Sequence, residues 1–401
     1  MNAPLVSNQP VKARAWWFVR QGLDGSLRGK TPAEILERSG WSRSVGGAGP
    51  YLTLFSRGRI SRATADAAAA NLEIHELPTA RGCTYVVPAS DFALGLTVGR
   101  NFGGDMKTAL KLGVTEREID ALSDAVVKAL EAGPLDPDGI RDATGNASRS
   151  LGEEGKKKGL STTLPLALGR LQTQGRIRRV PVNGRLDQQR YRYVNWTPNP
   201  LDTYAETMDA SFTDLAGRFF RWVGPATLGE FQWFSGLGMK AAKQAIEPLG
   251  LVPAEPGSDR FLLPGDVSAC AAFEPPGSPQ YALVSSLDPI TANRRELVTL
   301  LDPTDREQPV VVDATTKPIG TLVDLPSHAI LDRGRLIGLW EFDVDTESIV
   351  WATFDGKRDK ALASVVEETE TWVREELGDA RSFSLDSPKS RASRIAALRL
   401  R

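Results

Sequence analysis

Positive side chains are concentrated in one short stretch of this 401-residue chain. Residues 149–192 contain eleven lysines and arginines but three acids, although the whole sequence is nearly neutral, with 49 basic and 50 acidic residues. Such a dense group of cations either binds nucleic-acid phosphates or forms an ordinary solvated surface. The stretch therefore predicts DNA binding if its local fold presents the cations together.

The other side chains with catalytic potential do not form a complete site. Cys83 and Cys270 are far apart in the sequence, as are His75 and His328, which excludes a Cys/His cluster for zinc or iron–sulfur. Residues 25–31 resemble a phosphate loop but have three residues between the glycines where four are required. No Gly-x-Ser-x-Gly nucleophile motif is present. We therefore expect no metal and no organic cofactor.

A glycine-rich loop from Gly40 to Tyr51 brings several polar groups together. Its glycines allow the backbone to pass close to a partner, and Arg43, Ser44 and Tyr51 are able to contact a phosphate or a base. A flexible connector is the alternative interpretation. His75 follows on an expected strand, and we interpret it as a hydrogen-bonded structural residue rather than a general base.

The basic stretch lies within an order of elements typical of one DNA-binding fold. Three helices are expected: from Thr115 through Ala129, over Asp136 to Ala143, and from Ser161 or Thr162 through Gln172. A glycine-rich loop over 152–159 precedes the third helix. Asn183-Gly184 accepts a type I′ turn, which predicts a hairpin of 176–182 with 185–194. Helix, helix, helix, hairpin is the order of a winged helix-turn-helix.

In that fold the third helix enters the major groove, and the hairpin and the preceding loop meet the DNA backbone. The expected base contacts are few: Thr162, Thr163, Arg170 and Gln172. The expected phosphate contacts are Lys156, Lys157, Lys158, Arg178, Arg179, Arg185 and Arg190. This distribution favours recognition of shape and backbone over a strict sequence code.

Similar orders of elements occur on both sides of the basic stretch. Two extended runs near the N-terminus, 73–77 and 81–87, are expected to pair, while short strands such as 319–323 and a helix over 359–377 follow later. The fold class is α+β, with tandem winged helix-turn-helix units and a small C-terminal β-rich element. The expected division is 13–110, an N-terminal helical or winged-helix unit; 111–200, the basic winged helix; 201–265, a further winged helix; 266–380, a β-rich region with a terminal helix; and 381–401, a loose basic tail.

Several segments, in order along the chain, resemble a bacterial winged-helix family that includes alkylpurine and interstrand-crosslink DNA glycosylases (AlkZ/YcaQ-like). The segments are Arg20–Leu23, Pro50–Arg57, Arg81–Pro88 with Asp91, Trp222–Thr227 with Trp233 and Gly236-Leu237, and Gly334–Trp340. The ordered set extends over most of residues 13–355. The resemblance implies tandem winged helices that form a concave DNA-binding surface, followed by a β-rich element.

The sequence departs from this family at the catalytic pair. Members carry Gln-x-Gln or Gln-x-Asp a little before the arginine that matches Arg57, where the side-chain oxygens orient water and stabilise a sugar oxocarbenium ion. The loop from Trp41 to Gly49 takes that place here, and it contains neither glutamine nor carboxylate. Asp91 or Glu76 is a candidate substitute acid. The catalytic residues of this divergent sequence are left unassigned.

The sequence predicts a DNA-binding protein, related to repair glycosylases, that recognises damaged or distorted duplex DNA. If it is catalytic, it hydrolyses the N-glycosidic bond of a lesion base. A noncatalytic DNA binder or transcription regulator is the alternative, and an interaction module for an acidic protein is a third hypothesis. No run approaches the ~20 apolar residues of a membrane span, and the first residues lack signal-peptide features. We expect a cytoplasmic, monomeric protein without membrane contact.

Overall fold

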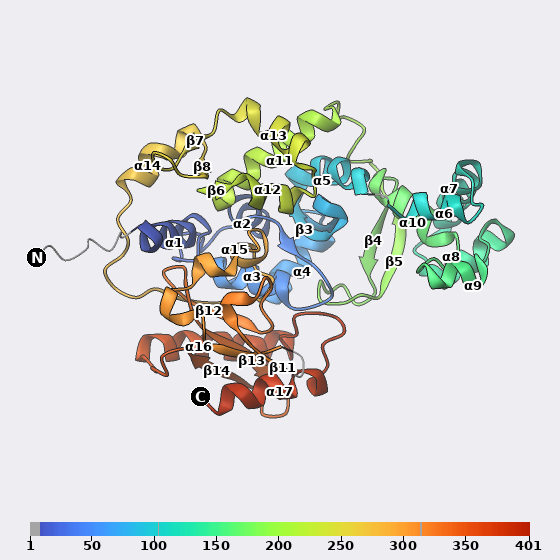
Figure 1. Ribbon diagram of the computed structural model, residues 1–401. Coiled ribbons are helices and arrows are strands. Elements are labelled where there is room, and N and C mark those ends of the chain that lie inside the picture. Colours follow the sequence, from blue (N-terminus) through green and yellow to red (C-terminus); the bar gives the residue numbers. More distant parts are fainter. Residues whose placement is uncertain (1–8, 103, 313–314) are drawn as a thin grey trace, which may run out of the picture.

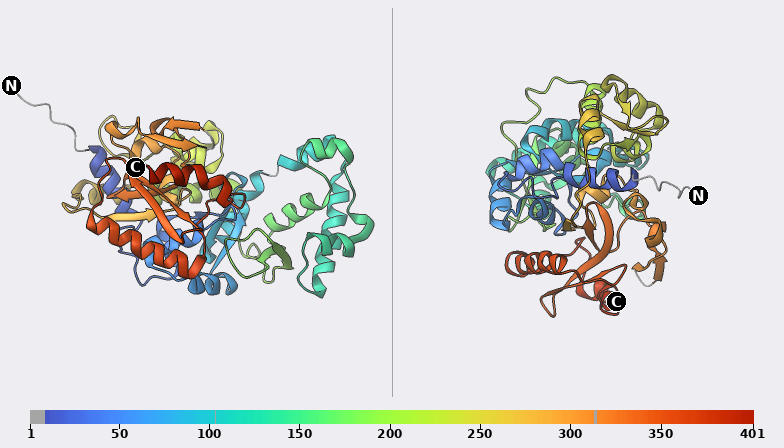
Figure 2. Two further views of the ribbon diagram at one scale, coloured as in Figure 1. Left: turned by 90° about the horizontal axis from the view of Figure 1, so that it is seen from below. Right: turned by 90° about the vertical axis from the view of Figure 1, so that its left-hand side faces the viewer.

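Helices and short antiparallel strands form a body from which one module projects (Figure 1, Figure 2). The computed structural model describes residues 9–102, 104–312 and 315–401. Its mixture of helix and strand confirms the expected α+β class. Within these described ranges, no helix is both long enough and apolar enough to cross a lipid bilayer.

The N-terminal part of the body surrounds a three-stranded sheet of order β1-β3-β2. Its elements are α1 (Gln9–Arg20), α2 (Pro32–Ser39), β1 (Ser42–Arg43), α3 (Gly49–Gly58), α4 (Arg62–Ala70), β2 (Ile74–Pro78), β3 (Thr84–Pro88) and α5 (Phe92–Gly99). The expected pairing of the two extended runs is confirmed as β2 with β3. Arg81 lies in the turn between them, η1 (Ala80–Gly82), rather than in the strand. The backbone N–H of Ser44 donates to the Thr84 carbonyl at the start of β3. The last residue of β1 therefore lies at the same end of the sheet as this turn.

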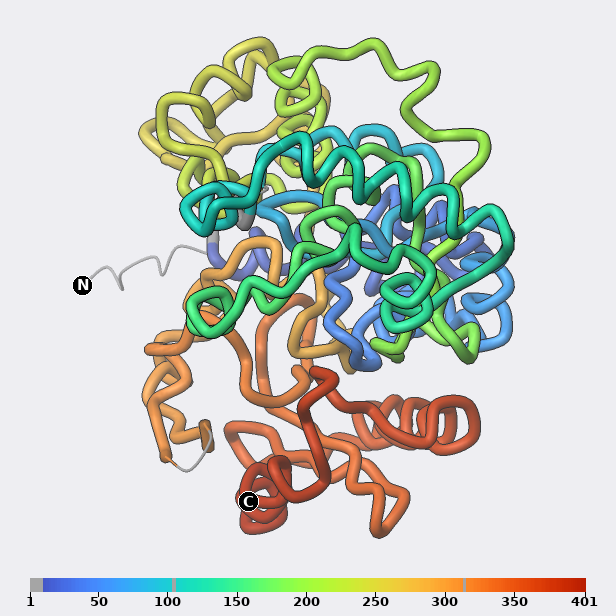
Figure 3. Tube along the Cα trace, turned by 90° about the vertical axis from the view of Figure 1, so that its right-hand side faces the viewer, coloured from blue at the N-terminus to red at the C-terminus, as the bar shows by residue number. Residues whose placement is uncertain are grey.

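Residues 104–196 form the projecting module, which has its own hydrophobic core. Its elements are α6 (Gly104–Lys111), α7 (Glu116–Ala129), α8 (Pro137–Thr144), α9 (Gly152–Lys157), α10 (Leu164–Thr173), β4 (Ile177–Pro181) and β5 (Tyr191–Asn195). Leu122 and Val126 of α7 face Leu168 and Leu171 of α10 in that core. The three expected helices are therefore present as α7, α8 and α10. Figure 3 views the molecule from the side of this module.

The glycine-rich segment 152–159 is helical rather than a loop, so that prediction is wrong. It forms α9 through Lys157. Gly155 lies at the closest approach of α9 to the following chain, because a Cβ atom there would come within 2.3 Å of the Leu160 carbonyl oxygen. Glycine therefore serves close packing at this position, and the lysines extend from a helix.

The predicted two-residue hairpin turn at Asn183-Gly184 is also wrong. The strand pairing ends at Pro181 and Tyr191, which leaves 182–190 as a long loop. Leu186 in this loop is buried in the core of the body, and its backbone N–H donates to Tyr51 Oη at 2.8 Å. Burial of a leucine side chain stabilises by about 1.5–3 kcal/mol, which outweighs the local preference for a tight turn.

Replacement of Tyr51 by Phe should loosen this docked loop. The Tyr51 hydroxyl accepts from the Leu186 N–H and donates to Asp66, so its loss leaves the buried Leu186 N–H without a partner, while Asp66 keeps its ion pair with Arg62. We expect the free energy of unfolding to fall by about 1–3 kcal/mol in urea titrations. Tyr204→Phe, which removes a hydroxyl paired with Ser211, is the control and should cost less. Equal losses of unfolding free energy in the two variants would show that the hydrogen bond between Tyr51 and the loop stabilises the protein no more than the bond of Tyr204 does.

The next part of the body packs an aromatic core against the N-terminal sheet. Its elements are α11 (Met208–Val223), β6 (Ala226–Thr227), α12 (Leu228–Ser235), α13 (Met239–Ile246), β7 (Val252–Pro253) and β8 (Arg260–Leu262). Trp222, Phe231 and Phe234 are buried together with Trp41, as expected for core residues. Trp233 is half-buried at the margin of this core.

The C-terminal part is built on a four-stranded antiparallel sheet of order β14-β13-β12-β9. Its elements are α14 (Val267–Ala272), β9 (Tyr281–Val284), α15 (Pro289–Ala292), β10 (Pro309–Val312), β11 (Thr315–Pro318), β12 (His328–Asp332), β13 (Arg335–Asp343), β14 (Ser348–Thr353), α16 (Lys360–Trp372) and α17 (Pro388–Arg399). The expected helix over 359–377 is α16, extended by one wide turn to Leu377.

Two predictions for the C-terminal part are wrong. The segment 319–323 is a short 3₁₀ turn with a buried Ile319 rather than a strand. The final segment is not a loose tail, because it contains α17 with buried arginines. Arg394 Nε donates to Glu341 at 2.7 Å, and Arg391 Nη1 pairs with Asp379 at 2.8 Å. Both acids lie outside α17. The basic composition of the final segment therefore could not show that its arginines are paired and buried.

A fully buried ion pair joins the N-terminal and C-terminal parts of the body. Arg57 in α3 forms two parallel hydrogen bonds with Asp288, from Nη2 to Oδ1 at 2.7 Å and from Nη1 to Oδ2 at 2.8 Å, and both side chains are 0% exposed. Arg57 Nε also donates to the Gln21 carbonyl at 2.9 Å. The bidentate geometry fixes α3 against the start of α15.

Candidate active site and DNA interface

Glu76 lies where the sheet of the body meets the hairpin of the projecting module. Its carboxylate accepts from Ser44 Oγ at 3.1 Å and from Tyr191 Oη at 3.0 and 3.1 Å. Arg179 Nη1 is 3.5 Å away. Ser44 follows β1, whereas Tyr191 and Arg179 belong to the β4–β5 hairpin. The side chain of Glu76 therefore links the glycine-rich loop, the sheet and the basic module.

Burial controls the charge of this carboxyl group. The residue is 7% exposed, and its desolvation raises the pKa of Glu76, while Arg179, Ser44 and Tyr191 act in the opposite direction. A carboxyl with a raised pKa exchanges protons closer to neutral pH than an exposed glutamate does. A carboxyl group in such an environment has the chemistry required of an acid or a base.

Asp91, the other candidate acid, is engaged inside the body. Trp41 Nε1 donates to Oδ2 and Arg218 Nε donates to Oδ1, each at 2.7 Å. The residue is buried, and its burial raises the pKa of Asp91. With both oxygens bonded in this way, Asp91 anchors Trp41 in the aromatic core. Of the two candidate acids, Glu76 alone adjoins the projecting module.

His75 is a packed side chain rather than the hydrogen-bonded one that we expected. Its ring lies edge-on to Phe92 and Trp196, and Nε2 is buried without a partner. Burial, together with the nearby charges of Arg178 and Arg179, lowers the pKa of His75 to about 3. The imidazole is therefore neutral near pH 7, which is consistent with a structural role.

The predicted contacts of the glycine-rich loop differ in burial. Tyr51 and Ser44 are buried, and each hydroxyl is bonded within the protein. Arg43 is half-buried, with its guanidinium carbon 5.3 Å from the centroid of the Tyr85 ring. Its Nη1 is buried and has no hydrogen-bond partner. Of these three residues, Arg43 has a hydrogen-bond donor without a partner, whereas the hydroxyls of Ser44 and Tyr51 hold Glu76 and the backbone of Leu186 in place.

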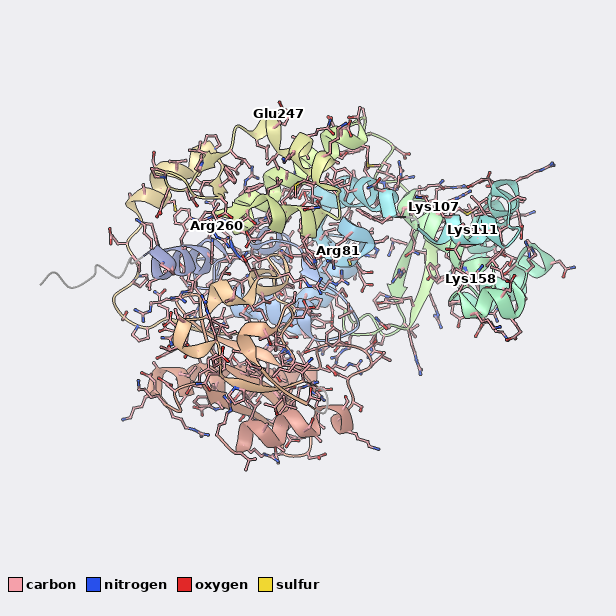
Figure 4. All side chains as sticks on the ribbon, in the orientation of Figure 1. Arg81, Lys107, Lys111, Lys158, Glu247 and Arg260 are labelled. Carbon is pink, nitrogen blue, oxygen red and sulfur yellow. The ribbon has the colours of Figure 1, made fainter. Side chains whose placement is uncertain are left out.

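The predicted lysines extend from α9 at the far end of the module (Figure 4). Lys156 pairs with Glu153 at 2.8 Å. Lys157 and Lys158 are exposed and have no ion pair within the described part of the chain. Figure 4 also labels Lys107 and Lys111 on α6 of the same module, and both are exposed. These lysines, two of which the sequence interpretation missed, are available to meet phosphates.

The predicted arginines of the module are mostly paired with acids. Arg170 bridges from α10 to Asp120, at 2.6 Å, and to Glu116, both on α7. Arg185 pairs with Asp187 and also donates to the Leu377 carbonyl at 3.2 Å. The fold therefore neutralises part of the basic stretch with carboxylates that precede it in the sequence. Arg178 and Arg190 have no ion pair among the residues that the structure describes.

The predicted base contacts at the start of α10 differ in exposure. Thr163 is 0% exposed and its hydroxyl accepts from the Arg149 N–H at 3.1 Å, so it cannot reach a base edge in this arrangement. Thr162 is half-buried. The open face of α10 lines a pocket of about 320 Å³ between the module and the body, with Phe102 and Arg100 on its other side.

Two arginines that the sequence interpretation missed lie near Arg43. The guanidinium carbons of Arg81 and Arg295 are 3.7 and 4.8 Å from the centroid of the Trp233 ring. Both arginines have left-handed backbone angles, with φ of 61° and 55°. The sequence gives no sign of this arrangement, because the three residues come from distant segments and neither arginine lies in the basic stretch.

The described residues contain no obvious set of metal ligands. No group of three or more His, Cys, Asp or Glu side chains there is placed to hold an ion. Cys83 and Cys270 are free thiols.

The body with its projecting module has the fold of a DNA repair glycosylase. It is similar to the solved structure of the DNA glycosylase AlkZ from Streptomyces sahachiroi, with a TM-score of 0.69 over 93% of this chain and 98% of that chain, at 18% sequence identity. The family model described as DNA glycosylase AlkZ-like matches residues 44–383. The chain therefore belongs to the AlkZ-like DNA glycosylase family, which confirms the expected resemblance. A comparison with curated protein sequences gave no match.

Proposed function

We propose that this protein binds damaged duplex DNA between its projecting module and its body, and that it hydrolyses the N-glycosidic bond of the lesion base. In this interpretation, 111–200 and 201–265 are winged-helix units, as their order of helices and hairpins favours. Membership of the AlkZ-like family supports the reaction class. Residue roles have to come from this chain, because its glycine-rich loop lacks the catalytic pair of the family.

One observation supports catalysis most directly: Glu76 places a carboxylate against the glycine-rich loop. Its hydrogen bond to Ser44 brings the missing acid to the segment where the family carries its own catalytic pair. The carboxylate comes from β2, across the central strand β3, and not from the loop itself. We assign Glu76 as the general base and electrostatic stabiliser of the reaction.

The proposed step needs one ionised carboxylate and one water molecule. The bond between C1′ of the sugar and the base nitrogen breaks, and its electron pair leaves with the base. Glu76 stabilises the positive charge that develops on the sugar and accepts a proton from the water whose oxygen bonds to C1′. The products are the free base and an abasic site. Tyr191 and Arg179 cover Glu76 in the structure, so the hairpin must turn aside to admit the lesion.

An abasic-site assay on a panel of duplexes with alkylated or crosslinked bases tests this function. We expect strand cleavage after heat or amine treatment for at least one lesion, and none for the matched undamaged duplex. Tight binding without abasic product would favour the noncatalytic binder instead. Absence of both binding and product would reject the proposal.

Exposed lysines of α9 should contribute to DNA affinity through phosphate contacts. Replacement of Lys157 and Lys158 by alanine is expected to weaken duplex binding and to reduce the slope of log K against log salt by about 2, because each phosphate contact releases condensed counterions. Binding isotherms at several salt concentrations measure this slope. The matched control is Lys360→Ala with Lys389→Ala, which removes two exposed lysines from α16 and α17. An equal change in both double variants would reject the assignment.

A further inference from the structure

Three guanidinium groups converge on the aromatic margin of the body. Arg43 lies over the Tyr85 ring, whereas Arg81 and Arg295 both lie over the Trp233 ring. They come from β1, the turn η1 and the segment after α15, which the fold brings together. We call Arg43, Arg81 and Arg295 the arginine cluster. Figure 4 labels Arg81 near the middle of the body.

The arginine cluster has more positive charge than its surroundings neutralise. Asp324 pairs with Arg295 at 3.1 Å, and this carboxylate is exposed. Neither Arg43 nor Arg81 has an ion pair within the described residues. Burial lowers the pKa of Arg81, and the charges of Arg43 and Arg295 lower it further, which places all three groups within electrostatic reach of one another.

Unused hydrogen-bond donors accompany this excess charge. Arg43 Nη1 and Arg295 Nε are both buried and have no partner in the protein. A buried donor without an acceptor costs about 1–3 kcal/mol, so such groups usually meet a ligand or water. A guanidinium stacked on a ring uses its flat face for that contact, so the N–H groups in its plane remain the groups that can meet an anion.

The position of Arg81 is fixed by tight packing. A Cβ atom on Gly236 would come within 2.7 Å of the Arg81 side chain and 2.8 Å of the Phe102 ring. The absence of a side chain at Gly236 therefore leaves the passage through which Arg81 reaches Trp233. A cation held by packing loses little conformational freedom when it binds a ligand.

We propose that the arginine cluster is a binding site for one backbone phosphate of the DNA strand, at the centre of the interface. This inference rests on the proposed function, since it names the group of the substrate that the body holds. A phosphodiester offers two anionic oxygens at a spacing that matches the donors of stacked guanidinium groups. The lysines of α6 and α9 hold the duplex at the module, and the cluster gives it a second, rigid point of attachment.

Methylphosphonate scanning tests the site at the level of single phosphates. In a short duplex that the wild-type protein binds, each phosphate in turn is replaced by an uncharged methylphosphonate, and affinity is measured for the full-length protein. We expect one linkage, or two adjacent ones, whose neutralisation weakens wild-type binding by about 10-fold or more. The variant Arg81→Gln with Arg295→Gln should bind the unmodified duplex about 10- to 100-fold more weakly and should be insensitive at that same linkage.

Matched variants distinguish the loss of the phosphate site from a general loss of charge or of folding. Arg358, whose guanidinium carbon lies 5.0 Å from the centroid of the half-buried Trp351 ring in the C-terminal sheet, is the control, and Arg358→Gln should leave the scan unchanged. Asp324→Asn removes the competing carboxylate and should tighten binding by about 2- to 5-fold, a gain that misfolding cannot produce.

The outcomes distinguish the inference from the function on which it rests. A wild-type protein that binds no duplex at low salt would reject both. Duplex binding with a scan that Arg81→Gln and Arg295→Gln leave unchanged, or with no gain for Asp324→Asn, would reject the arginine cluster as a phosphate site and leave the proposed function standing.

Discussion

Replacement of Glu76 by Gln should reduce base excision by about 100-fold or more while duplex affinity changes little. Glutamine keeps the shape of the side chain and still accepts hydrogen bonds from Tyr191 and Ser44, but it neither takes a proton from water nor carries negative charge. Single-turnover rates of abasic-site formation, measured with saturating enzyme, separate this chemical defect from weaker binding. Asp91→Asn is the comparison acid, and we expect its main effect on stability.

The pH dependence of the same variant provides a second test. Because burial raises the pKa of Glu76 above its ordinary value of 4.5, the folded protein favours the protonated carboxyl. The stability that this preference contributes is present below pH 4.5 and is lost as the pH rises through the folded pKa. The free energy of unfolding of the wild type should therefore decline relative to that of Glu76→Gln over this range.

The activity of the wild type should change in the opposite sense. The proposed base must be ionised, so the excision rate should rise with pH through the folded pKa of Glu76, and this limb should be missing in Glu76→Gln. A variant that retains the wild-type rate and pH profile would remove Glu76 from the mechanism. In that case the reaction would need another acid, or the protein would act as a noncatalytic binder.

Local sequence signals predicted the elements of the fold well where caps and periodicity agree. The cap expected at Thr115 marks a true helix start. Two of the failures share one physical cause, because each depends on partners that are distant in the sequence. Leu186 leaves its hairpin for the core of the body, and Arg394 is buried by Glu341.

The candidate site shows the same limit of prediction. The charge count identified a basic stretch, but the carboxylates of α7 that neutralise Arg170 lie outside the counted range. The sequence named Glu76 as a possible acid without any sign that it meets Ser44. Contacts of this kind depend on the order of strands in the sheet and on where the module lies. Neither can be read from the spacing or the composition of the sequence. The family resemblance was found because its motifs are local runs.

Breaking the buried pair of Arg57 and Asp288 should destabilise the protein most severely. Asp288→Ala leaves the guanidinium of Arg57 buried without its counter-charge, which costs about 3–5 kcal/mol. It also removes the hydrogen bond from the Ile290 N–H to Asp288 Oδ1, at the start of α15, which adds to the loss. Urea titration followed by circular dichroism measures the change in the free energy of unfolding.

A second variant decides whether the pair itself or the isolated charge is responsible. Arg57→Met with Asp288→Leu removes both charges and fills the space with apolar atoms, so its loss should be much smaller than that of Asp288→Ala, since the desolvation of two ions no longer opposes folding. Arg141→Gln, which breaks an exposed pair with Asp138, is the surface control and should cost about 1 kcal/mol or less. A double variant as unstable as Asp288→Ala would contradict this expectation, and the lost hydrogen bonds of Arg57 to Gln21 and Thr53 would then account for the instability of the double variant.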